Sequence, residues 1–460
     1  MITFGLIITA LSGIGLALCI SQRLKLIEVL GLAFPLGMGV QTFLMVCFDW
    51  VGIKLTAGSV ILATLILIAA LCTCLFFHRE NLKEWFRYVS TPGYPHLNWA
   101  WLLCIAVIGA VTVVNVTKTL YYPTFDTDSV RGYNLIGLAI GHEGTIKSLS
   151  LFTDVNYSMR GAASYMSYPP YSQLAYAYVY MLGAATSKIV NALIFISFIL
   201  TFYGALSRFA THLLTALTTL FVLLTPEMLG FSSLSGINFT HALFASLGIL
   251  YFITWYYKKI PSFLWLSAAF LMLNIWTRNE GPVFAAATCC ILLWYSLKNK
   301  QYKPLILYSV LCAFPFVFYT VFLKAHHLDA VSVLITKPFW DGAKLSSILR
   351  EEWDLLKNTT SYGFTFVACL LVFLSNLWHI YKRRDHVITL LLFLLVILFC
   401  TGLIYQLQLV WDSLEAIMRF SYKRLMFTFV PIAWFYIAAS RNMAWLFEKA
   451  DHFCFRDEHE

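Results

Sequence analysis

The sequence predicts an all-α polytopic membrane protein. Sixty per cent of its 460 residues are hydrophobic and only 12% are charged, whereas a soluble domain has about 25% charged residues. The mean hydropathy is +0.75. We expect helices to span the bilayer, because an open sheet would leave backbone groups unpaired in lipid and the alternation of barrel strands is missing.

Thirteen apolar stretches are close to the length of about 20 residues that a helix needs to cross hydrocarbon. They cover residues 1–20, 27–48, 57–77, 99–117, 187–206, 211–226, 240–257, 262–277, 283–297, 304–323, 362–381, 387–409 and 422–441. A further apolar stretch, 172–184, is rich in tyrosine. We expect it to form a helix that lies in the membrane interface, where tyrosines are favoured.

Short basic loops alternate with loops of mixed charge. The basic loops contain Arg23, Lys25, Arg79, Lys83, Arg87, Arg208, Lys258, Lys259, Lys298, Lys300, Lys303, Lys382, Arg383 and Arg384. Because such an excess marks cytoplasmic loops, we place the N-terminus and the long loops 118–186 and 324–361 outside the cytoplasm. Counting 172–184 as a span would reverse this orientation. The net charge of +9 comes largely from the basic loops and requires no nucleic-acid partner.

The chain divides by composition into three parts. Residues 1–98 hold the first helices and a basic cytoplasmic loop, 99–441 form the main membrane domain, and 442–460 form a cytoplasmic tail. A multi-pass protein of this kind belongs in a bacterial inner membrane or a plasma membrane, with the lipid bilayer as its first partner.

Asp126 and Asp128 stand at the beginning of the first long loop. Two carboxylates two residues apart can hold a divalent cation such as Mg²⁺ or Mn²⁺, or can act as a base and its partner. Asp128 or Ser129 can instead cap a helix that continues to about Ile140, but a cap does not account for Asp126 as well. We therefore expect a functional role for at least one of the two acids.

The same loop carries further candidates. His142 and Glu143 stand at the far end of the predicted helix, and a third acid is Asp154. His142 fits a solvated loop histidine as well as a ligand or proton carrier. Tyr168 belongs to the polar and aromatic segment 167–172.

Two other outer positions carry charge. Arg278 and Glu280 stand between two apolar stretches, where they can satisfy each other in a capped turn or serve a cavity. Arg419, Lys423 and Arg424 stand where the chain enters the last stretch. Positive charge at a helix start opposes the helix dipole, so an anionic ligand would explain this group. Snorkelling is the alternative, and it fits Lys423 and Arg424 better than Arg419.

A pattern of motifs extends over roughly residues 99–441. It consists of acids after an early span, then Tyr-Pro-Pro-Tyr, then Thr-Arg-Asn-Glu-Gly, and finally an arginine-rich start of a late span. This pattern resembles the GT-C superfamily of integral-membrane glycosyltransferases, which includes protein mannosyltransferases, oligosaccharyltransferase and lipid A aminoarabinose transferases. The chain departs from the superfamily pattern because three further spans precede the span that leads into the acidic loop, where many members have one. It also lacks a large soluble C-terminal domain, so it does not look like an oligosaccharyltransferase.

The resemblance implies a sugar donor on a polyprenyl phosphate and a glycan, lipid or protein acceptor. It also implies a catalytic cavity that opens away from the cytoplasm. Asp126 and Asp128 would match the acidic motif, and Arg419 would match an arginine near the donor phosphate, with Lys423 and Arg278 as further phosphate-binding candidates.

The residues fit this chemistry in their own right. A carboxylate can take the proton of an acceptor hydroxyl, cations can stabilise the leaving phosphate, and a single displacement inverts the anomeric carbon. A polysaccharide polymerase or ligase that uses lipid-linked sugars is one alternative, although it would depend on His and Arg. A secondary transporter is another, although the predicted spans are nearly free of charge.

Overall fold

The computed structural model describes residues 1–90, 99–153, 165–328, 341–382, 386–406, 414–443 and 445–446. Within these ranges the regular structure is entirely helical, with no strand. Asp154, Arg383, Arg384 and the tail from residue 447 lie outside the described residues. The predicted all-α class is therefore confirmed for the described part of the chain.

Eight helices among the described residues are long and apolar enough to cross a membrane. They are α1 (Ile2–Ile20), α2 (Leu26–Trp50), α3 (Ala57–Phe77), α5 (Trp99–Tyr121), α11 (Lys188–Leu206), α14 (Asn238–Lys258), α16 (Gly281–Asn299) and α17 (Lys303–Ala325). A ninth is obtained if α12 (His212–Leu224) and α13 (Pro226–Ser232), which meet at an angle of 69°, form one bent span. Pro226 explains the break, because proline disfavours a helical conformation in the residue before it.

Four further apolar helices are shorter. These are α15 (Pro261–Ile275), the segment Thr365–Trp378 of α20 (Thr365–Tyr381), the segment Val387–Gly402 of α21 (His386–Gln406) and α24 (Phe429–Ala439). Each of the thirteen predicted stretches thus contains helix. Length and composition identify only eight or nine as spans, so the prediction of about thirteen spans is not confirmed.

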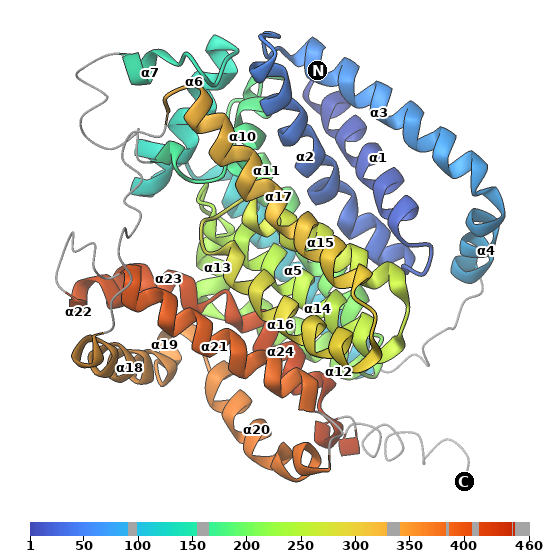
Figure 1. Cartoon of the computed structure of the whole chain (residues 1–460), viewed down its shortest axis with the longest axis vertical. Coiled ribbons are helices and arrows are strands. Elements are labelled where there is room, and N and C mark those ends of the chain that lie inside the picture. The colour runs from blue at the N-terminus through green and yellow to red at the C-terminus, as the bar shows by residue number, and fades with distance from the viewer. Residues whose placement is uncertain are drawn as a thin grey trace.

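The remaining helices connect the apolar ones. They are α4 (Arg79–Ser90), the π-helical turn η1 (Ser129–Tyr133), α6 (Asn134–Glu143), α7 (Ser150–Thr153), α10 (Tyr171–Met181), α18 (Gly342–Leu356), α19 (Thr359–Tyr362), α22 (Leu414–Ile417), the π-helical turn η2 (Met418–Tyr422) and α23 (Lys423–Met426). In Figure 1, α6, α7, α18 and α22 lie on the left side of the bundle and α4 on the right. The described helices α6, α7, α18 and α22 of the two long loops therefore lie on the same side of this view, and which side of a membrane they face stays a prediction.

Helix α10 differs from its prediction as an interfacial helix. All its residues from Tyr171 to Val179 are buried, and it packs against α2, α6 and α11. Its tyrosines tolerate burial because their hydroxyls find partners inside the protein. The Tyr176 hydroxyl donates to the Ser235 carbonyl at 2.8 Å, and the Tyr178 hydroxyl donates to the Gly5 carbonyl at 3.2 Å.

The first three helices are joined directly to the first long loop. Asp49, buried at the end of α2, accepts hydrogen bonds from the Thr145 hydroxyl (2.9 Å) and from the backbone N–H groups of Ile146 (3.1 Å) and Lys147 (2.9 Å). Gly144 ends α6 with φ +74°, and its N–H bonds to the Ile140 carbonyl. The N-terminal helices thus fix the segment that follows α6.

Candidate functional site

Asp126 is the residue that caps the helix of the first long loop. One of its carboxylate oxygens accepts from the Ser129 N–H at 3.1 Å and from the Ser129 hydroxyl. The other oxygen, Oδ1, is buried and has no hydrogen-bond partner among the described residues. The sequence suggested Asp128 or Ser129 as the cap, and the side chain that caps the helix is instead Asp126, two residues before Asp128.

Asp128 is consequently free of a capping role and faces other elements. Its Oδ1 accepts from the Tyr165 hydroxyl at 2.9 Å, and its Oδ2 forms an ion pair with Arg424 at the start of α23. The side chain of Asp128 is 33% exposed and that of Arg424 is 36% exposed. The pair is therefore accessible, and it joins the first long loop to the last apolar segment of the chain.

Three tyrosines stand beside Asp128. The ring centroid of Tyr133 lies 5.0 Å from that of Tyr165 and 5.8 Å from that of Tyr168, both with edge-on geometry. Tyr165 also approaches the backbone of η1 closely, since a Cβ on Gly132 would lie 2.4 Å from its ring. Glycine at position 132 is therefore required for this packing.

Arg278 and Glu280 reach the same cluster from the turn between α15 and α16. They form a salt bridge of 2.8 Å and are each 12% exposed, and Arg278 also donates to Asn238 of α14. Both charges interact electrostatically with Tyr133 and Tyr168. The predicted pairing of Arg278 with Glu280 is confirmed, and Pro282 stands in the first turn of α16 as expected.

The tyrosines act as hydrogen-bond donors in this setting. Burial raises the pKa of Tyr165, and the negative charge of Asp128 raises it further. Burial also raises the pKa of Tyr168, followed by the charge of Glu280. A phenol with a raised pKa stays protonated at neutral pH and can donate to a carboxylate or to a sugar oxygen.

Each cation of the late group has an acidic partner. Arg419 pairs with Glu415 one turn away at 2.7 Å, and both side chains are about two-thirds exposed. Lys423 pairs with Glu227 of α13, which is 15% exposed. Arg424, which the sequence ranked below Arg419, is the cation that reaches Asp128. The structure thus brings Arg424 to the cluster and leaves Arg419 on the surface.

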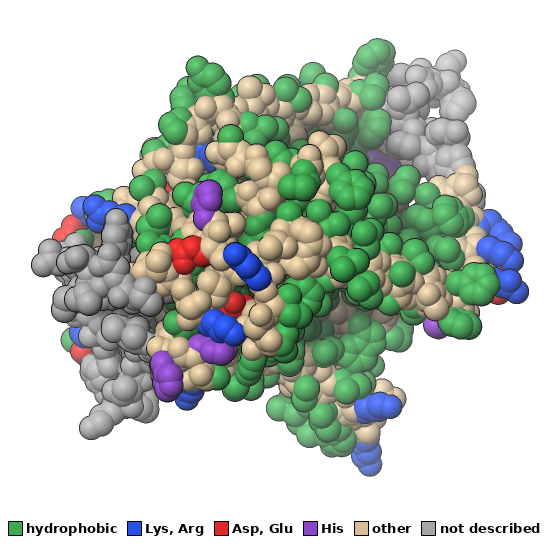
Figure 2. Space-filling view, turned by 90° about the horizontal axis from the view of Figure 1, so that it is seen from above, with side chains coloured by type: hydrophobic (Ala, Val, Ile, Leu, Met, Phe, Trp, Pro, Cys, Tyr) green, Lys and Arg blue, Asp and Glu red, His purple; other side chains and the backbone are tan. Residues whose placement is uncertain are grey.

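His142 and Glu143 lie away from the cluster. They occupy the far end of α6, about 20 Å along the helix axis from Asp128. Glu143 accepts from the Ser150 N–H at 2.8 Å, which holds the start of α7, and His142 is exposed. Figure 2 looks onto the end of the molecule at the top of Figure 1, where charged and histidine side chains are surrounded by hydrophobic ones.

An apolar groove of about 320 Å³ lies among the helices of the C-terminal part of the chain. Helices α18, α20, α21, α23 and α24 form it, and most of its lining is hydrophobic or aromatic. Met426 in its wall stands two residues after Arg424. The lining also includes exposed apolar side chains such as Phe393 and Val396, so the groove opens toward the surface that faces lipid in a membrane-embedded chain.

The carboxylates fit the predicted divalent cation poorly. Both oxygens of Asp128 already have protein partners, and one oxygen of Asp126 is used by Ser129. Within the described residues, no three or more His, Cys, Asp or Glu side chains are arranged as a metal site. The cation remains a prediction, and no step below depends on it.

Several residues of the cluster were not among the sequence candidates. Tyr165 and Asn238 stand among several other polar residues in the sequence and nothing local singles them out, and Glu227 follows a proline in an apolar region. Comparison of the chain with protein-family models, curated proteins and solved structures gives no match.

Proposed function

We propose that the chain is an integral-membrane glycosyltransferase that moves a sugar from a polyprenyl-phosphate donor to an acceptor hydroxyl. The observation that carries this proposal is the accessible Asp128–Arg424 pair, which places a carboxylate and a guanidinium together; Met426, two residues after Arg424, belongs to the lining of the apolar groove. A base for the acceptor and a cation for a leaving phosphate are the two groups that this transfer requires.

The groove supports the lipid nature of the donor. Its lining passes from Glu352 and Lys357 at the amphipathic helix α18 to Leu392, Phe393 and Val396 of α21. An extended apolar chain fits such a slot because burial of its methylene groups is favourable. The tail would leave its phosphate close to the start of α23, where Lys423 and Arg424 stand.

The residues divide the chemistry between them. Asp128 takes the proton of the acceptor hydroxyl while the acceptor oxygen forms its bond to the anomeric carbon. The bond from that carbon to the phosphate oxygen breaks, and the phosphate leaves with the electron pair. Arg424 meets the phosphate charge, and the Tyr165 hydroxyl orients Asp128. One displacement of this kind inverts the anomeric centre.

The proposal is tested by incubating the purified full-length chain with polyprenyl-phosphate sugars and following release of free polyprenyl phosphate. We expect release that depends on an added acceptor and that is lost in Asp128→Asn. Movement of the sugar lipid across a vesicle membrane without cleavage would favour the transporter alternative. Because both Asp128 oxygens have protein partners, we expect a chelator to leave turnover unchanged.

A further inference from the structure

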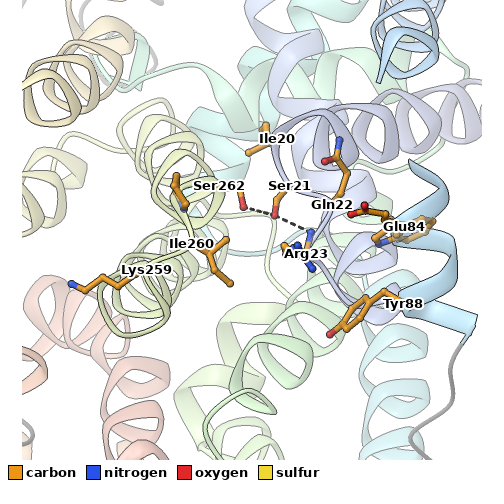
Figure 3. Close-up of a pocket in the computed structure, with 11 residues that line it drawn as sticks. Ile20, Ser21, Gln22, Arg23, Glu84, Tyr88, Lys259, Ile260 and Ser262 are labelled. Atoms are coloured by element: carbon orange, nitrogen blue, oxygen red, sulfur yellow. Dashed lines mark hydrogen bonds between the residues drawn. The ribbon is translucent and has the colours of Figure 1, made fainter. Parts of the chain in front are cut away.

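A cavity of about 440 Å³ lies on the side of the bundle away from the candidate site. Three segments form its walls: the turn between α1 and α2, the helix α4, and the turn between α14 and α15. Figure 3 shows the side chains that line it. The candidate site uses none of these residues.

The walls place the cavity where a bilayer surface would lie. Helix α4 follows directly after the apolar α3 and is strongly amphipathic. Phe76 and Phe77 at the end of α3 and Phe86 in α4 are exposed. Trp85 fixes α4 from the other face, because its buried indole N–H donates to the Leu24 carbonyl at 2.9 Å. The cavity therefore opens at the level of lipid headgroups in a membrane-embedded chain.

Opposite charges line this cavity without neutralising each other. Arg23 and Glu84 both belong to the wall, and neither side chain forms a salt bridge in the described ranges. One turn earlier in α4, by contrast, Glu80 pairs with Lys83 at 2.9 Å. An unpaired cation and an unpaired anion around one cavity are complementary to a ligand that carries both charges.

The other basic residue of the wall is already engaged. The Lys259 ammonium lies 4.1 Å from the ring centroid of Tyr256 and 4.5 Å from that of Tyr295, and Figure 3 shows it directed away from Arg23 and Glu84. Neutral polar groups complete the site, since Ser21 and Ser262 share a hydrogen bond of 2.8 Å at its base. The lining thus offers one positive and one negative group.

We propose that this cavity binds the headgroup of a phospholipid that carries a phosphate and a primary ammonium, as an ethanolamine phospholipid does. Arg23 would donate to the phosphodiester oxygens, and Glu84 would accept from the ammonium. A lipid fits better than a soluble compound because apolar side chains are exposed beside α4. The proposal is independent of the proposed transferase activity.

Native mass spectrometry of the delipidated full-length chain tests this proposal. We expect phosphatidylethanolamine to be retained about fivefold more than phosphatidylglycerol, which lacks the ammonium, as the loss of one exposed charge contact predicts. Glu84→Gln should abolish this preference, and Arg23→Gln should reduce retention of both lipids. Glu80→Gln, on the same helix, is the matched control and should behave like the parent chain.

Three results would overturn the assignment. The first is equal retention of the two lipids by the parent chain. The second is an unchanged preference in a Glu84→Gln variant whose melting temperature is normal. The third is displacement of the lipid by an equal concentration of soluble O-phosphoethanolamine, which would assign the cavity to a soluble ligand.

Discussion

Arg424 forms an ion pair with Asp128, which precedes it by 296 residues in the sequence. One residue begins the last apolar segment of the chain, and the other begins the helix of the first long loop. Tyr165 donates to the second oxygen of the same carboxylate. The two ends of the main membrane domain are therefore tied together at the proposed reaction centre.

The two acids of the first loop should respond differently to substitution. Asp128→Asn should leave a folded protein and lower turnover by about two orders of magnitude or more, as expected for loss of a general base. Asp126→Ala should act mainly on stability, because it removes the side chain that accepts from the Ser129 N–H, and the loss of a cap costs about 1 kcal/mol. Turnover and melting temperature measured on both variants separate these effects. Near-normal turnover in Asp128→Asn would contradict the catalytic assignment.

The late arginines provide a matched pair for testing phosphate binding. Arg424→Ala should weaken binding of polyprenyl phosphate by about 1.5–3 kcal/mol, the range for hydrogen bonds to charged groups. Arg424→Lys should restore it in part, because the two-pronged contact is lost. Arg419→Ala should have little effect, since it removes an exposed pair with Glu415.

Titration of each variant with a short-chain polyprenyl phosphate in detergent provides the measurement. If Arg424 only positions Asp128, affinity stays normal in Arg424→Ala while turnover falls. If Arg419 is the phosphate ligand, the order of the two alanine variants is reversed.

The sequence predicted local features of the site better than distant ones. The pair of Arg278 with Glu280 could be predicted because only one residue separates them and a proline stands in the first turn of the next helix. The partner of Asp128 could not be predicted, because its position depends on the packing of helices that are far apart in the chain. Arg419 and Arg424 are also five positions apart, which separates them by about 140° around an ideal helix. Which of the two faces Asp128 therefore depends on how the helix is rotated about its axis.

Composition likewise located the helices but not their environment. The tyrosine-rich stretch that forms α10 has the composition of an interfacial helix. Its hydroxyls instead find carbonyl partners such as Ser235 inside the protein. Apolar length alone could not separate the eight long helices from shorter ones such as α15.

A buried ion pair at the opposite end of the bundle should contribute strongly to stability. Glu28 of α2 is fully buried and pairs with Arg208, which is 11% exposed; the Tyr251 hydroxyl also donates to Glu28 at 3.1 Å. Glu28→Gln should lower the free energy of unfolding by about 3–5 kcal/mol, because it leaves a buried cation without its partner. Thermal unfolding in detergent measures the loss. Glu80→Gln is the exposed control, and an equal effect in both variants would show that Arg208 relaxes into solvent.

Cysteine labelling should place the long loops on one side of the membrane. Lys147→Cys and Lys344→Cys, introduced separately into a cysteine-free background, should react with an impermeant thiol reagent in intact cells. Lys300→Cys, between α16 and α17, should react only after the membrane is opened. Labelling of position 300 alone in intact cells would reverse the orientation and place the proposed reaction centre in the cytoplasm.

Two neighbouring residues of α21 allow the apolar groove to be tested. Val396 lines the groove and Ile397 does not, although they are 47% and 43% exposed. Val396→Trp should fill the slot and weaken binding of polyprenyl phosphate by about tenfold or more, because the lipid tail loses part of its buried apolar contact. Ile397→Trp adds the same side chain to the next face of the helix and should leave affinity unchanged. Binding of inorganic phosphate should be equal in the two variants, since the groove acts on the tail alone. Equal lipid affinity in both tryptophan variants would remove the groove from the donor site and leave the phosphate contacts to account for binding.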